Sequence, residues 1–157
     1  MGTCDHADCD LECGILDPVS LTERAGLTLT RDQLEEMLVD VHRHSDEEAC
    51  GLAAGISSTV EKIYPVTNAL HSSTRFRMDA TEQVRALMEI EKNGWELLAI
   101  YHSHVKGPAR PSETDTKEFA YPGVAYLIFD LSDGGQELRG FRMDGGEWIE
   151  IAITITG

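Results

Sequence analysis

The sequence predicts an α/β fold in which two or three helices pack against a mixed, curved β-sheet. Three observations favour this class. Segments of strand length alternate with segments whose apolar residues recur at helical spacing. Residues 97–102 form an unbroken apolar run ending in His, which is typical of a buried central strand. Turn-forming residues separate these segments, and no internal repeat or low-complexity stretch interrupts them.

The helices are predicted from their capping residues. Thr30 and Gln33 form a capping-box pattern ahead of apolar residues at helical spacing. Asp79 begins a second helix, which ends at Asn93-Gly94. The predicted helices cover residues 31–43, 79–93 and about 113–119.

The strands are predicted from short apolar or alternating segments that turn residues separate. They cover residues 49–54, 60–67, 75–78, 97–102, 124–130, 137–143 and 148–154. The first two flank a turn at 55–58 and are expected to pair as a hairpin. The segment 28–30 introduces the domain without being assigned to a strand, and 68–74 is expected to form a small flap.

Length and charge limit the function. The chain has 157 residues, enough for one domain with a proper core. A formal net charge of −15, from 28 acidic and 13 basic side chains, argues against nucleic acid and anionic membranes as partners. No apolar run approaches the roughly 20 residues that span a membrane. The chain also lacks the basic and apolar start of a secretory signal, so a cytoplasmic protein is expected.

Residues 1–27 are predicted to be an extension that precedes a domain at 28–157. This extension contains Cys4, Cys9 and Cys13 together with His6. The four side chains could hold a second, structural Zn²⁺, although their spacing differs from the paired C-x2-C of common zinc modules. We favour the alternative, a flexible or lightly docked acidic extension with reduced thiols.

The pattern H-S-H-x7-S-x2-D, which begins at His102, is the most informative feature of the chain. His102, His104 and Asp115 are the donor types of a catalytic zinc site, in which three protein ligands leave a fourth position open. Residues two apart on a strand share a face, so the two imidazoles would project together, opposite Ser103. Gly and Pro residues then form a loop that can carry Asp115 back. Upstream, Glu48 offers a carboxylate that can take a proton from water.

Each part of this pattern also has a simpler interpretation. A second H-x-H pair, His42 and His44, ends the first predicted helix, where residues two apart lie about 200° apart around the axis and cannot chelate one ion. Ser112 with Asp115 resembles an N-capping box, and the two residues can cap a helix and still face a metal. Glu48 alone would be a surface carboxylate. The occurrence of all the parts in this order is what favours a metal site.

The residues Glu48–Gly51, followed by the histidine motif, resemble the JAMM (MPN-plus) zinc metallopeptidases over about residues 28–157. The resemblance implies the cytidine-deaminase-like MPN fold. The short segment after Asp115 leaves little space for the insertions of larger eukaryotic members, so the chain is most similar to the compact prokaryotic ones. Cys50 is expected to be buried rather than nucleophilic, and Gly51 to permit close packing beside the site.

The resemblance also implies a role for each residue of the site. His102, His104 and Asp115 would bind Zn²⁺. Glu48 would act as general base toward water and then protonate the leaving amine. Ser112 would donate a hydrogen bond to the oxyanion.

Family members remove ubiquitin or ubiquitin-like proteins from their conjugates, which implies hydrolysis of the bond after a C-terminal Gly-Gly. In one version the partner is a sulfur-carrier protein and the released group is cysteine or another small amine. In the other, the bond is an isopeptide to lysine. The compact size favours the first version, and the tail is expected to bind as an added strand at a sheet edge. Dimers are common in the family, so the resemblance allows a homodimer, although no single stripe of residues in the sequence marks an interface.

Two other functions remain as alternatives. One is a non-catalytic MPN interaction scaffold, which the intact motif disfavours. The other is a zinc amidohydrolase acting on a small molecule, although the patterns of zinc deaminases and of H-E-x-x-H enzymes are missing.

Overall fold

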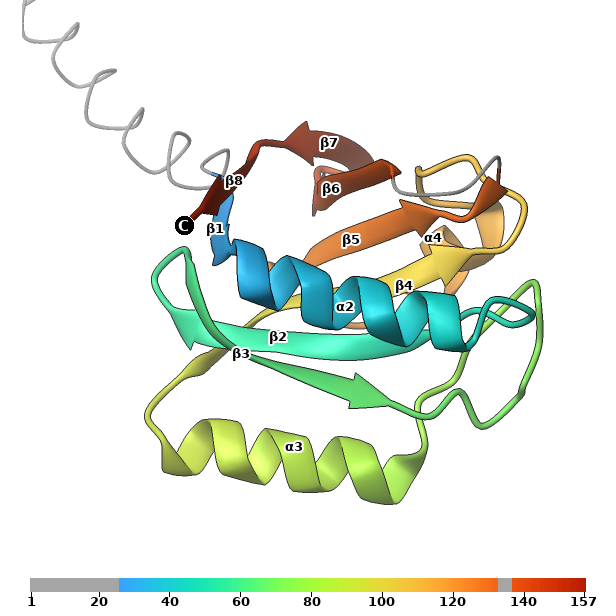
Figure 1. Ribbon diagram of the computed structural model, residues 1–157. Coiled ribbons are helices and arrows are strands. Elements are labelled where there is room, and N and C mark those ends of the chain that lie inside the picture. The colour runs from blue at the N-terminus through green and yellow to red at the C-terminus, as the bar shows by residue number, and fades with distance from the viewer. Residues whose placement is uncertain (1–25, 133–136) are drawn as a thin grey trace, which may run out of the picture.

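A computed structural model describes residues 26–132 and 137–157 (Figure 1). The helices are α2 (Arg31–Arg43), α3 (Ala80–Lys92) and α4 (Glu113–Glu118). The strands are β1 (Leu27–Thr30), β2 (Cys50–Ile56), β3 (Thr59–Val66), β4 (Glu96–His104), β5 (Ala125–Asp130), β6 (Glu137–Asp144), β7 (Glu147–Ile151) and β8 (Ile153–Thr156). The Cys-rich extension predicted over 1–27 lies outside these residues, apart from its last two positions.

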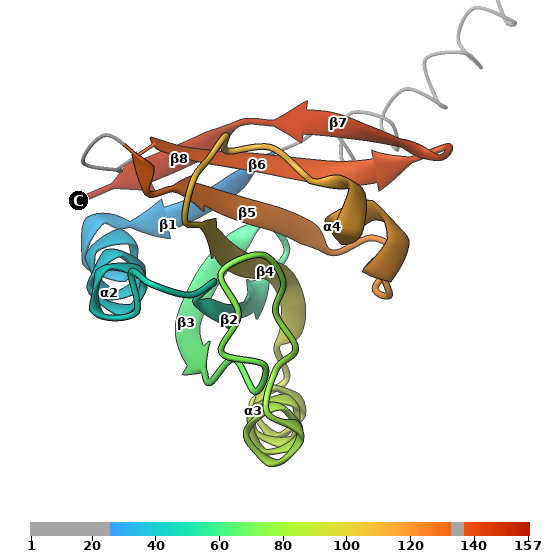
Figure 2. The same ribbon diagram turned by 90° about the vertical axis from the view of Figure 1, so that its right-hand side faces the viewer.

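Within the described residues, the strands form one mixed sheet in the order β7-β6-β5-β4-β2-β3-β1-β8. The pairs β4–β5, β1–β3 and β1–β8 are parallel, and the other pairs are antiparallel. Strands β7 and β8 follow each other in the chain but stand at opposite ends of this order, so the sheet curls nearly into a barrel (Figure 2). Leu27 N–H donates to Ala152 O at 3.0 Å, where the chain passes between them. The predicted mixed, curved sheet is confirmed.

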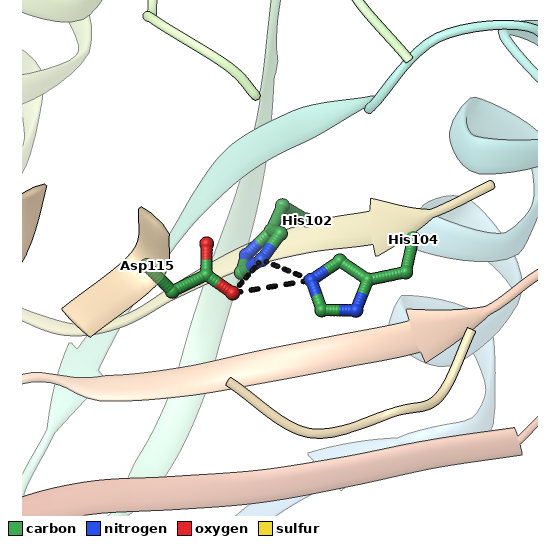
Figure 3. Close-up of side chains that lie close together, drawn as sticks. All are labelled: His102, His104 and Asp115. Carbon is green, nitrogen blue, oxygen red and sulfur yellow. Dashed lines mark hydrogen bonds and ion pairs between the residues drawn. The ribbon is translucent and has the colours of Figure 1, made fainter. Parts of the chain in front are cut away.

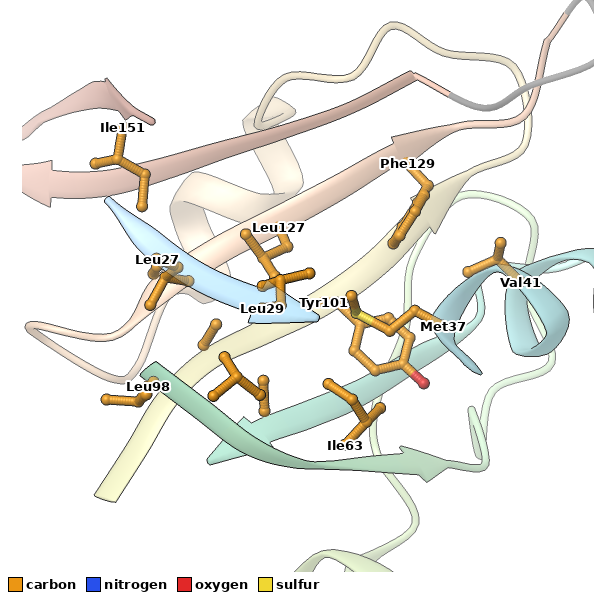
Figure 4. Close-up of a cluster of buried hydrophobic side chains, with 14 of the residues drawn as sticks. Leu27, Leu29, Met37, Val41, Ile63, Leu98, Tyr101, Leu127, Phe129 and Ile151 are labelled. Carbon is orange, nitrogen blue, oxygen red and sulfur yellow. The ribbon is translucent and has the colours of Figure 1, made fainter. Parts of the chain in front are cut away.

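The helices cover different parts of this sheet. Helix α2 packs against β1, β3 and β8, and α3 packs against β2, β3 and β4, so the two lie on opposite sides of the β2–β3 hairpin (Figures 1 and 2). Along β4 the side chains alternate. Ala99 and Tyr101 enter the core beneath α2 together with Met37 (Figure 4), whereas Ile100 enters the core on the α3 side. His102, two residues after Ile100, lies on that second face.

The capping residues determine where the helices begin, as predicted. Thr30 Oγ1 accepts from Gln33 N–H at 3.1 Å, and the Gln33 side chain accepts from Thr30 N–H at 2.9 Å. Asp79 caps α3, which Gly94 follows with φ +72°. In the ranges that the structure describes, no helix combines the length and apolarity needed to cross a membrane.

Three strand assignments differ from the prediction. The segment 75–78 is not a strand and makes a single bridge between Met78 and Asn68, because the Asn68 side chain takes the hydrogen bonds that a neighbouring strand would take. The predicted strand 148–154 is divided at Ala152, where the chain leaves β6 and joins β1. The four residues of β1, Leu-Thr-Leu-Thr, were not assigned to a strand, although their alternation favours one.

Candidate metal centre

Strand β4 and helix α4 bring together three ligand groups of the kind that binds metal ions. His102 and His104 project from the same face at the end of β4, and Asp115 projects from the first turn of α4 (Figure 3). One donor atom of each lies within 4.8 Å of the others. All three side chains are buried, with His102 at 0% relative exposure. The strand spacing therefore places the imidazoles as predicted.

The geometry of these three donors fits a tetrahedral cation. The two Nε2 atoms are 3.2 Å apart, and each lies 3.1 Å from Asp115 Oδ2. A tetrahedral Zn²⁺ with bonds of about 2.0–2.1 Å to such ligands has edges of about 3.3 Å. His104 Nδ1 donates to Pro108 O at 2.7 Å, so the Nε2 of the neutral ring is an acceptor that faces a second acceptor, the carboxylate. A metal cation between them resolves this conflict, as a proton on Nε2 does in the metal-free protein.

Neighbouring groups hold the ligands in place. Phe76 stacks on the His102 ring with centroids 4.7 Å apart. The Pro108 carbonyl fixes the tautomer of His104, which is the usual outer support of a metal-binding histidine. Asp115 Oδ2 accepts from Ser112 N–H at 2.9 Å, so the capping box of α4 also orients the carboxylate.

The three ligands influence one another electrostatically. Burial lowers the pKa of His102, although the nearby Asp115 carboxylate acts to raise it. Burial also opposes protonation of His104, but its hydrogen bonds to Asp115 and to Pro108 O outweigh this and raise its pKa. Burial alone would raise the pKa of Asp115. Both imidazoles and the Ser112 N–H outweigh this effect and hold the pKa of the carboxyl well below its usual range. The carboxylate therefore stays ionised, as a metal ligand must.

Glu48 lies beside this group without belonging to it. Its side chain is buried, with Oε1 lacking a hydrogen-bond partner among the described residues. Burial raises its pKa to about 8; His104 opposes this rise, and Asp115 and Glu118 add to it. A carboxylate next to the ligands that is not consumed by hydrogen bonds is free to exchange a proton with water.

Ser103 connects Glu48 to the ligands. Its buried side chain lies opposite the imidazoles, and its Oγ accepts from the N–H of Ala49 at 2.9 Å. Ser103 N–H in turn donates to Ala49 O at 3.0 Å. The residue between the two histidines thus holds the residue that follows Glu48.

Ser112 is half-buried at the start of α4. Its Oγ accepts from Asp115 N–H at 3.0 Å, which completes the capping box predicted from the sequence. In the described part of the chain this is the hydroxyl's one hydrogen bond, so its proton is available to an acceptor. The capping geometry and the proposed role toward a substrate oxygen are therefore compatible.

Cys50 and Gly51 serve packing in this structure. The Cys50 thiol is fully buried, donates to Val66 O at 3.4 Å, and has its pKa raised by burial. A Cβ on Gly51 would lie 2.3 Å from Cε2 of Tyr101, so the glycine is required by a side chain of β4. Both findings agree with the structural roles expected for these residues.

Some contributors to the site were not predicted. Asn68 and Phe76 belong to the segment expected to form a flap and a strand, and the structure places them against Glu48 and His102 respectively. The sequence predicts a strand over 75–78, and that prediction gives no indication that Phe76 contacts His102. The pair His42 and His44 is exposed at the end of α2, and His44 contacts Asp40, as expected for side chains outside the site.

A cavity of about 360 Å³ opens beside Asp115. Its apolar lining includes Phe76, Ile100 and Tyr126, and Gln83 and Glu118 supply polar groups. A larger cavity of about 500 Å³, near Glu96, contains none of the site residues. Of these two cavities, the one beside Asp115 is lined by a residue of the ligand group and the other is not.

Comparison with protein families gives one match over most of the chain. Residues 30–144 match the family described as prokaryotic homologs of the JAB domain. A probable TtuB-protein conjugate cleaving protease from Thermus thermophilus is 38% identical over 131 residues, covering 82% of each chain. The CysO-cysteine peptidase of Mycobacterium tuberculosis is 33% identical over 132 residues, covering 82% of this chain and 90% of the relative. A desampylase from Haloferax volcanii is 33% identical, covering 69% and 78%.

Solved structures resemble the fold as well. A protein from Desulfitobacterium hafniense is 35% identical with a TM-score of 0.75, covering 83% of this chain and 92% of that one. A JAB1/MPN domain protein from Archaeoglobus fulgidus has a TM-score of 0.59 at 16% identity, covering 83% and 100%, and this likeness concerns the fold alone.

Proposed function

The chain belongs to the JAB domain family, among its prokaryotic homologs, and from this premise we propose the reaction that it performs. It is a peptidase that hydrolyses the C-terminal linkage of a ubiquitin-like or sulfur-carrier protein. The bond cleaved is the one after a C-terminal Gly-Gly, and the resident metal is Zn²⁺.

One observation supports this proposal most strongly. The donors of His102, His104 and Asp115 form a triangle of tetrahedral dimensions, and the buried carboxylate of Glu48 lies within electrostatic reach of it. When bound, Zn²⁺ would lower the pKa of a water molecule to about 7 and polarise a carbonyl group. Two neutral imidazoles and one carboxylate suit this ion and leave a position open.

The chain's own residues would handle the protons. Glu48 takes a proton from the attacking water and later gives it to the leaving amine. Its burial suits both steps, since a raised pKa makes the carboxylate a better base and its conjugate acid a stable donor. Ser112 O–H donates to the oxyanion that develops on the substrate carbonyl. Ser103 accepts a hydrogen bond from Ala49 and so holds the segment of Glu48 next to the strand that carries the two histidines.

The substrate class follows from the names of the relatives. One relative is named for cleaving TtuB–protein conjugates, another for CysO-cysteine, and two are desampylases. These names favour a peptidase over a scaffold or a small-molecule amidohydrolase. We favour the sulfur-carrier version, with cysteine or another small amine as leaving group, over an isopeptide to lysine. The cytoplasmic location expected from the sequence stays a prediction, and so does the homodimer that the resemblance allows.

Intact-mass spectrometry on two substrates tests this function. One is a sulfur carrier extended by cysteine after Gly-Gly, and the other is a ubiquitin-like protein joined through Gly-Gly to a lysine side chain. We expect cleavage after Gly-Gly that a chelator abolishes and Zn²⁺ restores, with the sulfur-carrier substrate preferred. Absence of cleavage of both substrates by zinc-loaded protein would contradict the proposal.

Two variants separate metal binding from chemistry. Asp115→Asn is expected to lower bound zinc, measured by elemental mass spectrometry, together with turnover. Glu48→Gln is expected to keep bound zinc and lose turnover by at least about 100-fold, because only proton transfer is removed. Normal turnover by Glu48→Gln would exclude Glu48 as the base.

A further inference from the structure

The Glu48 side chain has a carboxylate oxygen that no hydrogen bond among the described residues holds in place. Its Oε1 is buried, and no hydrogen bond to it exists among the described residues. A general base must nevertheless hold its position, because a displacement of about 1 Å can cost about 100-fold in rate. The position of this carboxylate must therefore come from the backbone that carries it.

Hydrogen bonds from three directions fix that backbone. Glu48 N–H donates to Ser72 O at 2.8 Å, and Glu48 O accepts from Asn68 Nδ2 at 3.0 Å. The next residue, Ala49, is held by Ser103 on β4. Residues 68–72 thus supply both hydrogen bonds to the Glu48 backbone, and Ser103 of β4 accepts the hydrogen bond from the next residue, Ala49.

Asn68 organises the segment that makes these bonds. The side chain is 3% exposed. Its Oδ1 accepts from the N–H groups of Leu70 and Arg77, at 3.0 and 3.1 Å. Its Nδ2 donates to Arg75 O at 3.1 Å and faces Ser72 O at 3.5 Å, besides the bond to Glu48. The Asn68 amide therefore connects the backbone of Glu48, the proposed base, to the loop at both Leu70 and Arg77.

The chemistry of these contacts requires an amide. Leu70 and Arg77 present donors, and Glu48, Ser72 and Arg75 present acceptors. Among side chains of this size, only asparagine offers both two donor hydrogens and an acceptor oxygen. An aspartate would keep the two acceptor bonds but would direct an oxygen at three carbonyl groups. Leaving these buried groups unpaired is unfavourable.

We infer that Asn68 is a positioning residue for the reaction, acting through Glu48 by holding its backbone and the loop that pairs with it. This inference rests on the proposed function of Glu48 as base. It predicts that substitution of Asn68 lowers turnover and leaves the ligands His102, His104 and Asp115 able to bind zinc, because none of its hydrogen bonds goes to them.

The test compares zinc-loaded wild type, Asn68→Ala and Asn68→Asp on the substrate that the wild type cleaves. Asn68→Asp keeps the volume and the acceptor bonds, so it stays informative if Asn68→Ala does not fold. We expect kcat to fall by about 10–100-fold in both, with KM and bound zinc within about twofold of wild type. Asn93→Ala is the matched control, since the exposed Asn93 side chain also donates to a backbone carbonyl, Glu89 O at 2.8 Å. It should keep the wild-type kcat.

A double-mutant cycle distinguishes positioning from a general structural effect. In the Glu48→Gln background, Asn68→Ala should lower the residual rate by less than about threefold, since the base that it positions is gone. A second readout needs no activity. In metal-free protein, the Glu48 amide of Asn68→Ala should exchange its hydrogen at least about 10-fold faster than in wild type, with β5 amides unchanged.

Three outcomes would overturn the inference. The first is a wild-type kcat in a folded Asn68 variant, and the second is an equal fold-loss in both backgrounds. The third is an inactive wild type, which would remove the proposed function as well. Cleavage by the wild type together with either of the first two results would leave the proposed function standing and reject the role of Asn68 alone.

Discussion

Replacing Glu48 by glutamine tests the electrostatics of the proposed base through protein stability. Burial raises the pKa of Glu48 from 4.5 to about 8, against the opposing effect of His104. Between these pH values the folded protein keeps a proton that the unfolded chain has released. Because the folded state then binds more protons, the free energy of unfolding falls as pH rises through this window.

The size of the effect follows from the same two pKa values. At about 1.4 kcal/mol per pH unit, the interval from 4.5 to about 8 corresponds to about 5 kcal/mol of destabilisation above pH 8. Below pH 4.5 both states are protonated and the cost disappears. Glutamine has nearly the same shape and cannot ionise. Glu48→Gln should therefore stabilise the metal-free protein by about 1 kcal/mol at pH 5 and by several kcal/mol at pH 9.

Urea unfolding of metal-free wild type and Glu48→Gln at pH 5, 7 and 9 measures this difference. Glu61→Gln is the control, because it removes a carboxylate that is exposed on β3 rather than buried beside the ligands. A stability difference for Glu48→Gln that stays constant with pH would refute the reasoning. Saturating Zn²⁺ should shrink it, since a nearby cation favours the carboxylate.

Three further substitutions test other parts of the site. Ser112→Ala should lower kcat by about 100–1,000-fold at saturating zinc and lower the free energy of unfolding by about 1 kcal/mol through loss of the cap; an unchanged kcat would exclude it from oxyanion stabilisation. Gly51→Ala should destabilise the protein by about 1–3 kcal/mol, because its methyl would overlap the Tyr101 ring, and an unchanged thermal midpoint would contradict this. Cys50→Ala should cleave substrate within about twofold of wild type, since the buried thiol is protonated; a tenfold loss in the cleavage assay would argue otherwise.

The parts of the site that the sequence predicted depend on short-range geometry. His102 and His104 share a face because they are two apart on a strand, and the apolar run before them identified that strand. Ser112 and Asp115 are joined by the capping box that begins α4. Each of these relations spans a few residues, so a pattern of residue types is enough to predict it.

The fold was predictable to a similar extent. The capping residues located α2 and α3, and the turn between β2 and β3 located the hairpin. The division of the last strand at Ala152 was not predictable, because it depends on pairing with Leu27 at the other end of the domain. The prediction of a strand over 75–78 is wrong for a related reason. The side chain of Asn68 makes the hydrogen bonds that a neighbouring strand would otherwise make.

The contacts that place the base are all long-range. Ser103 holds Ala49 from 54 residues away, and Asn68 reaches Glu48 across 20 residues. Metal binding therefore depends on a local motif, whereas proton transfer depends on tertiary contacts that the motif does not contain. It follows that the two should be separable. Loss of a ligand should remove zinc and turnover together, and loss of Asn68 should lower turnover while zinc stays bound.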